Sequence, residues 1–199
     1  MAKASDNQFP YVHLVPAAAP ANPTAGERLY LDSGDGNKLK RRSTAGVVTT
    51  IEGGGATTFI GARVYNSANI ACTNAADTLL TFNSERYDTD TIHSTASNTG
   101  RLTATTAGKY HISATVIFAA SATGARGLQI RLNGTTTVAI VRTPAVAGGT
   151  DSTALTISTD YDLAATDYVE LLAYQTSGGS LNVLAGGNYS PEFMMHRLG

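Results

Sequence analysis

The chain has 199 residues, a formal net charge of −1 and a charged fraction of 15%, which lies below the roughly 25% typical of soluble domains. Thr, Ser, Ala, Asn and 20 Gly replace the missing charge, and such residues favour strands and tight turns over long helices. The near-neutral charge gives no electrostatic footprint for nucleic acid, so we expect no nucleic-acid partner. No run approaches the roughly 18 apolar residues of a membrane span, and the N-terminus lacks an apolar signal core. We therefore expect no membrane partner and synthesis in a cytoplasm.

Residues 1–25 are predicted to form an extended arm, because prolines recur from Pro10 onward beside an alanine run. Proline removes backbone donors, so this segment suits neither a helix nor a central strand. We expect neighbouring copies or a partner surface to hold the arm. Its apolar residues Phe9, Tyr11 and Leu14 are the anchoring candidates.

Residues 26–56 are predicted to form a small β-hairpin region that ends in a glycine hinge at 53–55. Alternating apolar residues indicate strands at 28–31 and 38–42, and Asp35-Gly36 between them is a strong hairpin turn signal. A third strand is expected near residues 46–52. A hairpin of this size is marginal in water and needs a sheet or a partner.

The basic cluster of the chain lies in the second of these strands, at Lys38, Lys40, Arg41 and Arg42. A solvated strand end is the simpler interpretation, and a docking patch for an acidic partner is the alternative. On the second interpretation Lys38, Arg41 and Arg42 are further anchoring candidates.

Residues 57–199 are predicted to form the main domain. Short candidate strands follow one another at regular spacing, among them one at residues 78–87. Gly- and Asn-containing turns such as Asn133-Gly134 separate them, which is typical of an all-β sandwich, jelly roll or barrel. In residues 110–118 one face is apolar. Its members are Tyr110, Ile112, Ala114, Val116 and Phe118.

Residues 168–174 carry large groups on both faces of a predicted strand. Val169, Leu171 and Ala173 form the core face, and the opposite face still holds apolar groups. A sheet that is partly apolar on both faces needs a second cover, and another copy of the chain is the economical one. The trimer-interface candidates on that opposite face are Tyr168, Leu172 and Tyr174.

The sequence offers little catalytic or metal-binding chemistry. Cys72 stands in an apolar stretch and is predicted to be a buried hydrophobe, and the four histidines lack the spacing of a zinc site. Asp88 and Asp90 are weak candidates for a hard cation, and the low charge argues against a glycosidase pair. We expect no catalytic residue, no metal, no cofactor and no enzyme activity.

The order of segments in residues 60–199 resembles the globular head of the complement-one-q and tumour-necrosis-factor superfamily. The most recognisable piece is GRLTATTAGKYHISATVIF at 100–118, an entry strand, a Thr-Ala-Gly turn and a hydrophobic strand. Thr166-Asp167 stands where the family usually shows Gly-Asp, and Met194-Met195 where Gly-Phe is common. The other matching pieces are ARVYNSA, DTLLTFNSERYDT, LQIRLNGTTTVAIVR, ALTISTDYDLAATDYVELLAYQ and YSPEFMMHRLG. The resemblance implies a ten-stranded jelly-roll sandwich that assembles as a homotrimer.

Residues 21–53 resemble the short hairpin of phage tail-fibre and virion appendage proteins, and no Gly-X-Y period of a collagen stalk occurs. The sequence therefore predicts a bacteriophage virion protein, a trimeric capsid decoration or cement protein held by its N-terminal region. Its expected partners are the major capsid protein or other virion proteins. The alternative is a short tail fibre or receptor-binding spike that recognises a glycan or protein on a host surface.

Overall fold

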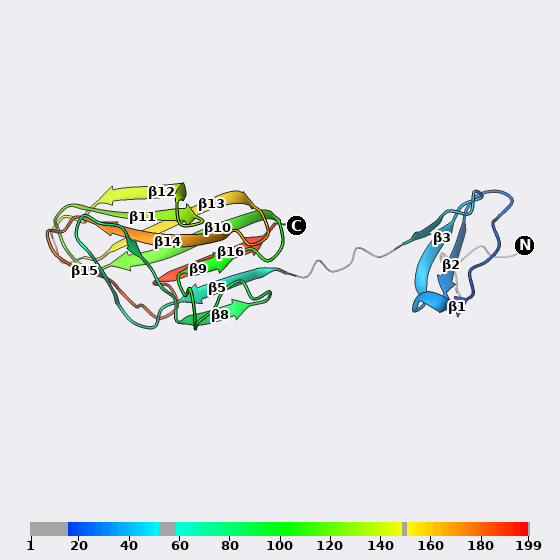
Figure 1. Ribbon diagram of the computed structural model, residues 1–199, viewed down its shortest axis with the longest axis horizontal. Helices are drawn as coiled ribbons and strands as arrows, with labels where there is room; N and C mark the ends of the chain where they lie inside the picture. The colour runs from blue at the N-terminus through cyan, green and yellow to red at the C-terminus, as the bar shows by residue number, and fades with distance from the viewer. Residues whose placement is uncertain (1–15, 52–58, 149–150, 199) are drawn as a thin grey trace, which may run out of the picture. The chain divides into compact units, whose positions relative to one another are not determined.

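The computed structural model describes residues 16–51, 59–148 and 151–198. It divides into two compact units, residues 1–57 and residues 58–199, which Figure 1 draws as a small sheet and a larger sandwich. Strands and one short 3₁₀ segment make up the regular structure of the described residues. Within these ranges the structure holds no helix long and apolar enough to cross a membrane.

The small unit is a four-stranded sheet in the order β1-β2-β3-β4. Its elements are β1 (Pro16–Ala17), β2 (Arg28–Asp32), η1 (Ser33–Asp35), β3 (Lys38–Arg42) and β4 (Val48–Thr50). The turn lies where the sequence predicts it, and Gly36 adopts the left-handed conformation (φ 62°) that ends η1. Of its described residues only Tyr30 is buried, so this unit has very little core.

The larger unit, called the head below, holds twelve described strands. They are β5 (Gly61–Tyr65), β6 (Ile70–Cys72), β7 (Thr78–Leu79), β8 (Ser84–Asp88), β9 (Arg101–Thr103), β10 (Gly108–Phe118), β11 (Ala125–Leu132), β12 (Thr136–Pro144), β13 (Thr153–Leu163), β14 (Tyr168–Gln175), β15 (Leu181–Val183) and β16 (Glu192–Arg197).

Two antiparallel sheets form the head. The seven-stranded sheet runs β6-β15-β10-β16-β5-β8, with β13 paired to the other edge of β10, and the five-stranded sheet runs β12-β11-β14-β7, with β9 also paired to β14. The predicted all-β jelly-roll sandwich is confirmed. Twelve strands stand in place of the expected ten because β15 and β16 share one edge of β10, and β7 and β9 share one edge of β14.

The core lies between the two sheets and follows the predicted alternation. The core face of β10 is fully buried from Tyr110 to Phe118, and on β14 Val169, Leu171 and Ala173 are buried in the same cluster. Phe82 and Phe193 stack at the centre with ring centroids 5.7 Å apart. Burial of apolar surface at about 25 cal/mol per Å² is the main force that holds the two sheets together.

One predicted strand is wrong. Residues 78–87 were expected to form a single strand, but β7 ends at Leu79 and β8 begins at Ser84. Leu80 and Phe82 between them are both fully buried, and their amides bond to the carbonyls of Leu171 and Thr99. The chain crosses here from the five-stranded to the seven-stranded sheet. The residues between β7 and β8 therefore belong to neither sheet, and the side chains of Leu80 and Phe82 enter the core.

One end of the sandwich is closed by polar side chains that face the core. Arg126 is fully buried, and it donates to the carbonyls of Ser121, Thr123 and Ala125. Burial lowers the pKa of this guanidinium. Its register partner Gln175 bonds to the carbonyls of Cys72 and Gly179. These bonds tie the connecting loops to the sandwich.

The core predicts a large loss of stability for Phe193→Ala. The substitution empties a fully buried ring site against Phe82, which costs about 3–5 kcal/mol of unfolding free energy. Urea unfolding of the full chain, followed for the head, measures the loss. Tyr189→Ala removes a ring that is 56% exposed and is the control. Equal midpoints for the two variants would contradict this packing.

Candidate functional site

The strongest polar feature of the five-stranded sheet is the side chain of Glu170, which is 3% exposed although it points away from the core. Glu170 lies between Arg131 of β11 and Arg101 of β9 in the strand register. Its Oε1 accepts from Arg101 Nε at 3.2 Å, and its Oε2 accepts from Arg131 Nη2 at 3.1 Å. One buried carboxylate thus holds two guanidinium groups, and the trio keeps one net positive charge.

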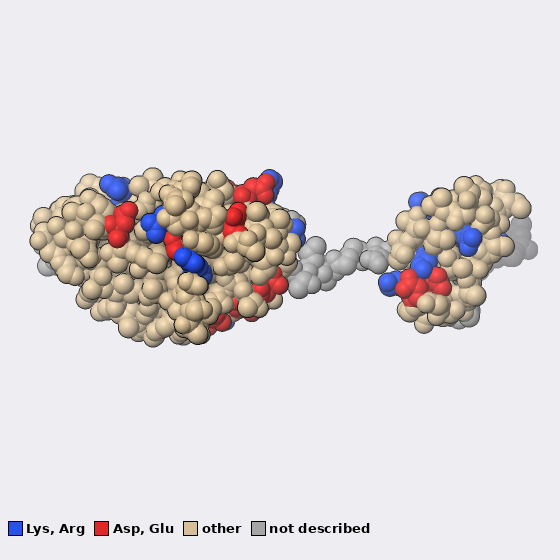
Figure 2. All heavy atoms as spheres, in the orientation of Figure 1, with Lys and Arg blue, Asp and Glu red and all other residues tan. Residues whose placement is uncertain are grey.

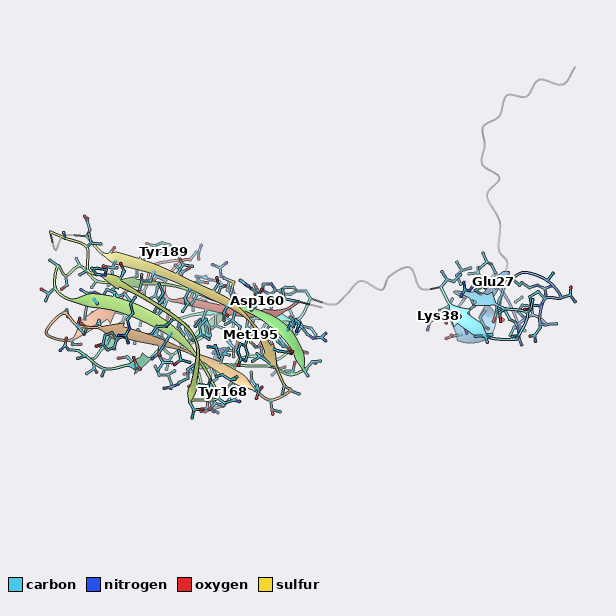
Figure 3. All side chains as sticks on the ribbon, turned by 90° about the horizontal axis from the view of Figure 1, so that it is seen from above. Glu27, Lys38, Asp160, Tyr168, Tyr189 and Met195 are labelled. Atoms are coloured by element: carbon cyan, nitrogen blue, oxygen red, sulfur yellow. The ribbon has the colours of Figure 1, made fainter. Side chains whose placement is uncertain are left out.

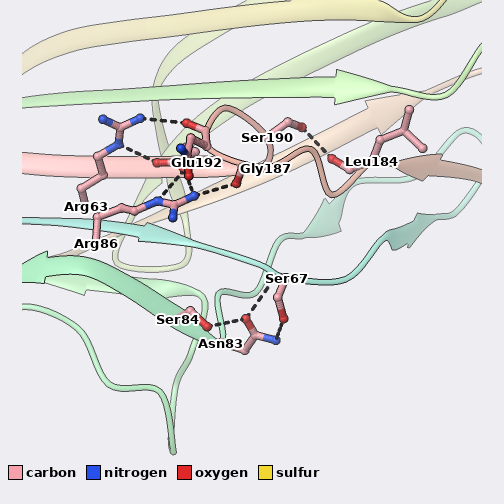
Figure 4. A network of polar contacts seen from close by, with 10 residues as sticks. Arg63, Ser67, Asn83, Ser84, Arg86, Leu184, Gly187, Ser190 and Glu192 are labelled. Carbon is pink, nitrogen blue, oxygen red and sulfur yellow. Dashed lines mark hydrogen bonds and ion pairs between the residues drawn. The ribbon is translucent and has the colours of Figure 1, made fainter.

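The seven-stranded sheet repeats this arrangement at Glu192, as Figure 4 shows. Glu192 is 1% exposed, and it accepts from Arg63 Nε at 2.5 Å and from Arg86 Nη2 at 2.9 Å. Arg86 occupies a register shift between β5 and β8, and its guanidinium lies 3.8 Å from the ring centroid of Tyr65. Arg63 also donates to the carbonyl of Asn188, and Arg86 donates to the carbonyl of Gly187. Both arginines therefore bind the loop before β16.

Arg101 differs from these arginines because two hollows open beside it. One has a volume of about 170 Å³ and the other about 240 Å³, and both are lined by Asn98 and Arg101. The lining combines hydroxyl and amide groups, such as Ser94 and Ser97 of the first hollow and Thr81 of the second, with apolar groups, and Glu170 also borders the second hollow. The Arg101 guanidinium lies 4.0 Å from the ring centroid of Tyr168, so the tyrosine ring supports one face of the guanidinium.

The loop that borders these hollows is held by the buried side chain of His93. Nδ1 of His93 lies 2.8 Å from Glu85 Oε1, and Nε2 lies 3.2 Å from the carbonyl of Thr99. The same carbonyl accepts from the amide of Phe82 at 2.9 Å. Because Thr99 is bonded from two sides, Asn98 and Gly100 beside it are also held in place.

The predicted interface residues Tyr168, Leu172 and Tyr174 lie on the outer face of β14, and Figure 3 labels Tyr168 on one side of the head. Leu172 is 2% exposed within a single chain, beneath a 2.5 Å hydrogen bond from Gln129 to Asp77 that spans β14. Arg142 covers the ring of Tyr174 at 4.3 Å. The burial of Leu172 therefore needs no second copy, and the assignment of these three residues to an interface stays a prediction.

The outer face of the seven-stranded sheet is covered far less. Its central rows pair Ser113 with Ser158 and Met194, and Thr115 with Thr156, and none of these short or uncharged side chains is fully buried. The same rows end at the Arg63–Glu192 pair, because Arg63 is in register with Met194 and Glu192 with Thr115. Figure 2 draws one face of the head, on which charged groups of both signs lie in a few clusters within an otherwise uncharged surface. This surface, called the central neutral face below, consists of Ser113, Thr115, Ile117, Ala154, Thr156, Ser158 and Met194.

A pair of histidines borders the central neutral face. His111 and His196 are register partners with ring centroids 5.3 Å apart, and His111 Nδ1 lies 2.7 Å from Asp160 Oδ1. Burial lowers the pKa of His196, and the neighbouring His111 lowers it further. Asp160 opposes both effects, so this edge of the face holds the two rings beside a carboxylate.

The groups that the sequence offered for metal or nucleophile chemistry have structural partners. Asp88 accepts from the backbone amides of Asp90, Ile92 and His93 at 2.9–3.1 Å, and Asp90 bonds to the Thr105 hydroxyl. Cys72 is buried, and burial raises the pKa of its thiol. Residues 16–51, 59–148 and 151–198 contain no group of three or more His, Cys, Asp and Glu that could hold a metal ion.

The basic cluster of the small unit is largely neutralised by its neighbours. Lys40 lies 2.8 Å from both Asp32 and Asp35, and the hydrogen bonds to these carboxylates raise its pKa. The anchoring candidates Lys38 and Arg41 lie 3.5 Å from Asp35 and 3.4 Å from Glu27. The third, Arg42, donates to Asn22 at 2.6 Å. Figure 3 labels Lys38 and Glu27 in this unit. The other candidates, Phe9, Tyr11 and Leu14, lie outside the described residues.

The small unit exposes an apolar row instead. Leu31 pairs with Leu39 in the sheet register, and the amide of Ile51 bonds to the carbonyl of Leu39, so these three side chains share one face with Leu29. Leu29 is 50% exposed and Ile51 39% exposed. We call Leu29, Leu31, Leu39 and Ile51 the N-terminal apolar row. Leu31 and Leu39 are half-buried, and Arg41, the register partner of Leu29, lies on the same face.

Sequence reasoning missed Arg101 and its hollows. The available signal was Glu170, a carboxylate in the middle of an apolar strand, which needs a cationic partner if it is buried. The partners stand 39 and 69 residues away, and their identity required the strand register.

Comparisons with solved structures agree with the jelly roll. Eiger TNF from S. frugiperda is 15% identical with a TM-score of 0.51, and the match covers 71% of this chain and 93% of that chain. Murine APRIL at pH 8.5 is 10% identical with a TM-score of 0.54, over 71% of this chain and all of that chain. No family model and no curated protein sequence matches. At these identities the similarity establishes a tumour-necrosis-factor-like fold.

Proposed function

We propose that this chain is a structural display protein of a virus particle. Its head associates as a homotrimer, and its small N-terminal unit attaches it to a shell protein of the particle. The role is non-enzymatic, and a bacteriophage capsid decoration protein is the form that the sequence predicts. The observation that carries the proposal is the central neutral face, an uncovered sheet surface in the middle of a well-packed sandwich.

Association of copies through the central neutral face has a simple physical basis. Short side chains such as Ser113 and Thr156 lose little rotamer entropy when they are ordered. On the opposite sheet, long side chains pack against their own chain, as Arg142 does against the ring of Tyr174. They already cover that surface. The resemblance of the sequence to a family of trimeric heads supports three copies.

Attachment through the small unit follows from its lack of a core. One buried side chain, Tyr30, among residues 16–51 gives little stability to a four-stranded sheet. The N-terminal apolar row is the surface that a shell protein would cover. The neutralised lysines and arginines favour such an apolar contact over an electrostatic one.

A second role, recognition of a host surface by the head, is favoured by the hollows beside Arg101. They open on the sheet opposite the central neutral face, so association of copies leaves them accessible. A head of this kind can serve both roles on one particle.

Ser113→Arg is expected to break the homotrimer. An arginine at position 113 would lie opposite Ser158 and Met194, and a second copy that covers the neutral face would clash with its long side chain and would have to desolvate its charge. Light scattering after gel filtration should give the mass of one 20.6 kDa chain in place of three. Ile140→Arg, at a side chain 57% exposed on β12 of the other sheet, is the control and should stay trimeric. A trimeric Ser113→Arg variant would refute this interface.

Leu29→Asp is expected to abolish attachment and to leave the head folded and trimeric. The aspartate would remove an apolar side chain from the N-terminal apolar row and add a charge opposite Arg41, and a shell protein that covers the row would have to desolvate this charge at a cost of at least about 1–3 kcal/mol. Co-sedimentation with particles produced without this protein measures attachment. Val48→Asp changes a similarly exposed valine (42%) in register with Arg42 on the opposite face, and it should still attach. Attachment of Leu29→Asp at the wild-type level would count against the anchor.

A further inference from the structure

We propose that the hollows beside Arg101 bind an acidic sugar, a small hydroxylated ligand that carries one carboxylate. Three observations lead to this class: the two unused nitrogens of a fixed guanidinium, the net charge of its cluster, and the chemistry and size of the lining. The inference rests on the recognition role of the head. It requires neither the trimer nor the N-terminal anchor.

The guanidinium of Arg101 is fixed by groups that leave its terminal nitrogens available. Its Nε donates to Glu170, and the ring of Tyr168 supports its face. Nη1 and Nη2 donate no hydrogen bond within the part of the chain that the structure describes. Paired terminal N–H groups are the geometry that binds a carboxylate with two parallel bonds. Because the group is held before a ligand arrives, little entropy is lost on binding.

The charge of the cluster selects a monoanion. Glu170 is shared by Arg101 and Arg131, so the three groups together carry one positive charge. A carboxylate neutralises that charge. A dianionic phosphate would leave a net negative charge beside the buried carboxylate of Glu170. The cluster therefore favours a ligand with a single carboxylate.

The lining selects hydroxyl groups around that carboxylate. Asn98, Ser94, Ser97 and Thr81 present neutral donors and acceptors, and Leu79 supplies an apolar surface to the second hollow. Glu170 also borders the second hollow, and its carboxylate is already held by Arg101 and Arg131. Pockets for drug-sized molecules measure about 300–1,000 Å³. Each hollow here is smaller, about 170 and 240 Å³, so each suits one sugar ring, and the shared Arg101 lies between them.

Hydrogen bonds and close packing hold the rim of the hollows in place, which allows it to discriminate between ligands of different shape. Thr99 is bonded by His93 and Phe82, and the amide of Arg101 donates to the carbonyl of Asn98 at 3.0 Å. At Gly100 an added Cβ would lie 2.9 Å from the carbonyl oxygen of Leu80. The loop therefore lies directly on the segment that follows β7, and a larger residue at 100 would displace the rim.

The test is a titration of the ¹⁵N-labelled full chain, followed by amide chemical shifts. The probes are the methyl glycosides of N-acetylneuraminic acid and glucuronic acid, methyl galactoside as the neutral analogue, and inorganic phosphate. We expect at least one acidic sugar to shift the amides of Ser97, Asn98, Gly100 and Arg101. Galactoside and phosphate should bind at least about tenfold more weakly, because a charge-assisted bidentate contact contributes this much.

Variants separate the guanidinium from the fold. Arg101→Ala should weaken acidic-sugar binding at least tenfold, and Arg101→Lys should restore only part of it because lysine keeps the charge and loses the fork. Arg142→Ala removes another arginine stacked on a tyrosine of the same sheet, lines neither hollow, and should bind as the wild type does.

Four results would overturn the inference. They are no shift with either acidic sugar at millimolar concentration, equal shifts with galactoside, stronger binding of phosphate at the same amides, and unchanged binding by Arg101→Ala. Each can occur while Ser113→Arg still breaks the trimer and Leu29→Asp still abolishes attachment, so failure here is distinguishable from failure of the display role.

Discussion

The carboxylate of Glu170 is the interaction on which the outer surface of the five-stranded sheet depends. A buried carboxylate is tolerated only when it is paired, and removal of one partner from a buried pair typically costs about 3–5 kcal/mol. Here β11 and β9 each place an arginine beside it in register. The pairing draws the side chains of Arg131 and Arg101 across the sheet. Arg101 is thereby placed on Tyr168 and between the two hollows.

The pairing of a few buried carboxylates with arginines also explains why charge is distributed differently on the two sheets. Only 15% of the residues are charged, and the central carboxylates Glu170 and Glu192 engage four of the arginines. On the seven-stranded sheet this pairing lies at β5, β8 and the start of β16. The rows through Ser113 and Thr115 end at this pair, because Arg63 is in register with Met194 and Glu192 with Thr115. Away from the pair these rows hold short or uncharged side chains, which the proposed second copy can cover without desolvating a charge.

Local patterns predicted much of the fold, and long-range register accounts for what they missed. The alternation from Tyr110 to Phe118 and the turn at Gly36 depend on neighbours in sequence, and both are where they were expected. The break at Leu80 arises because the chain changes sheets, and the side chains there face the core on both sides of the crossing. The partners of Glu170 also come from separate strands. Periodicity marks which face a residue occupies, but it carries no information about which distant strand lies beside it.

The central neutral face, the hollows beside Arg101 and the N-terminal apolar row lie on separate surfaces. The core between the sheets fixes both outer faces, because side chains alternate strictly along β10 and β14. A substitution on one outer face, such as at Ser113, leaves the other face in place, since only core-facing residues are shared. The N-terminal apolar row belongs to a unit with its own sheet. The proposed association, recognition and attachment thus use three different sets of side chains, and each set can change without loss of the other two.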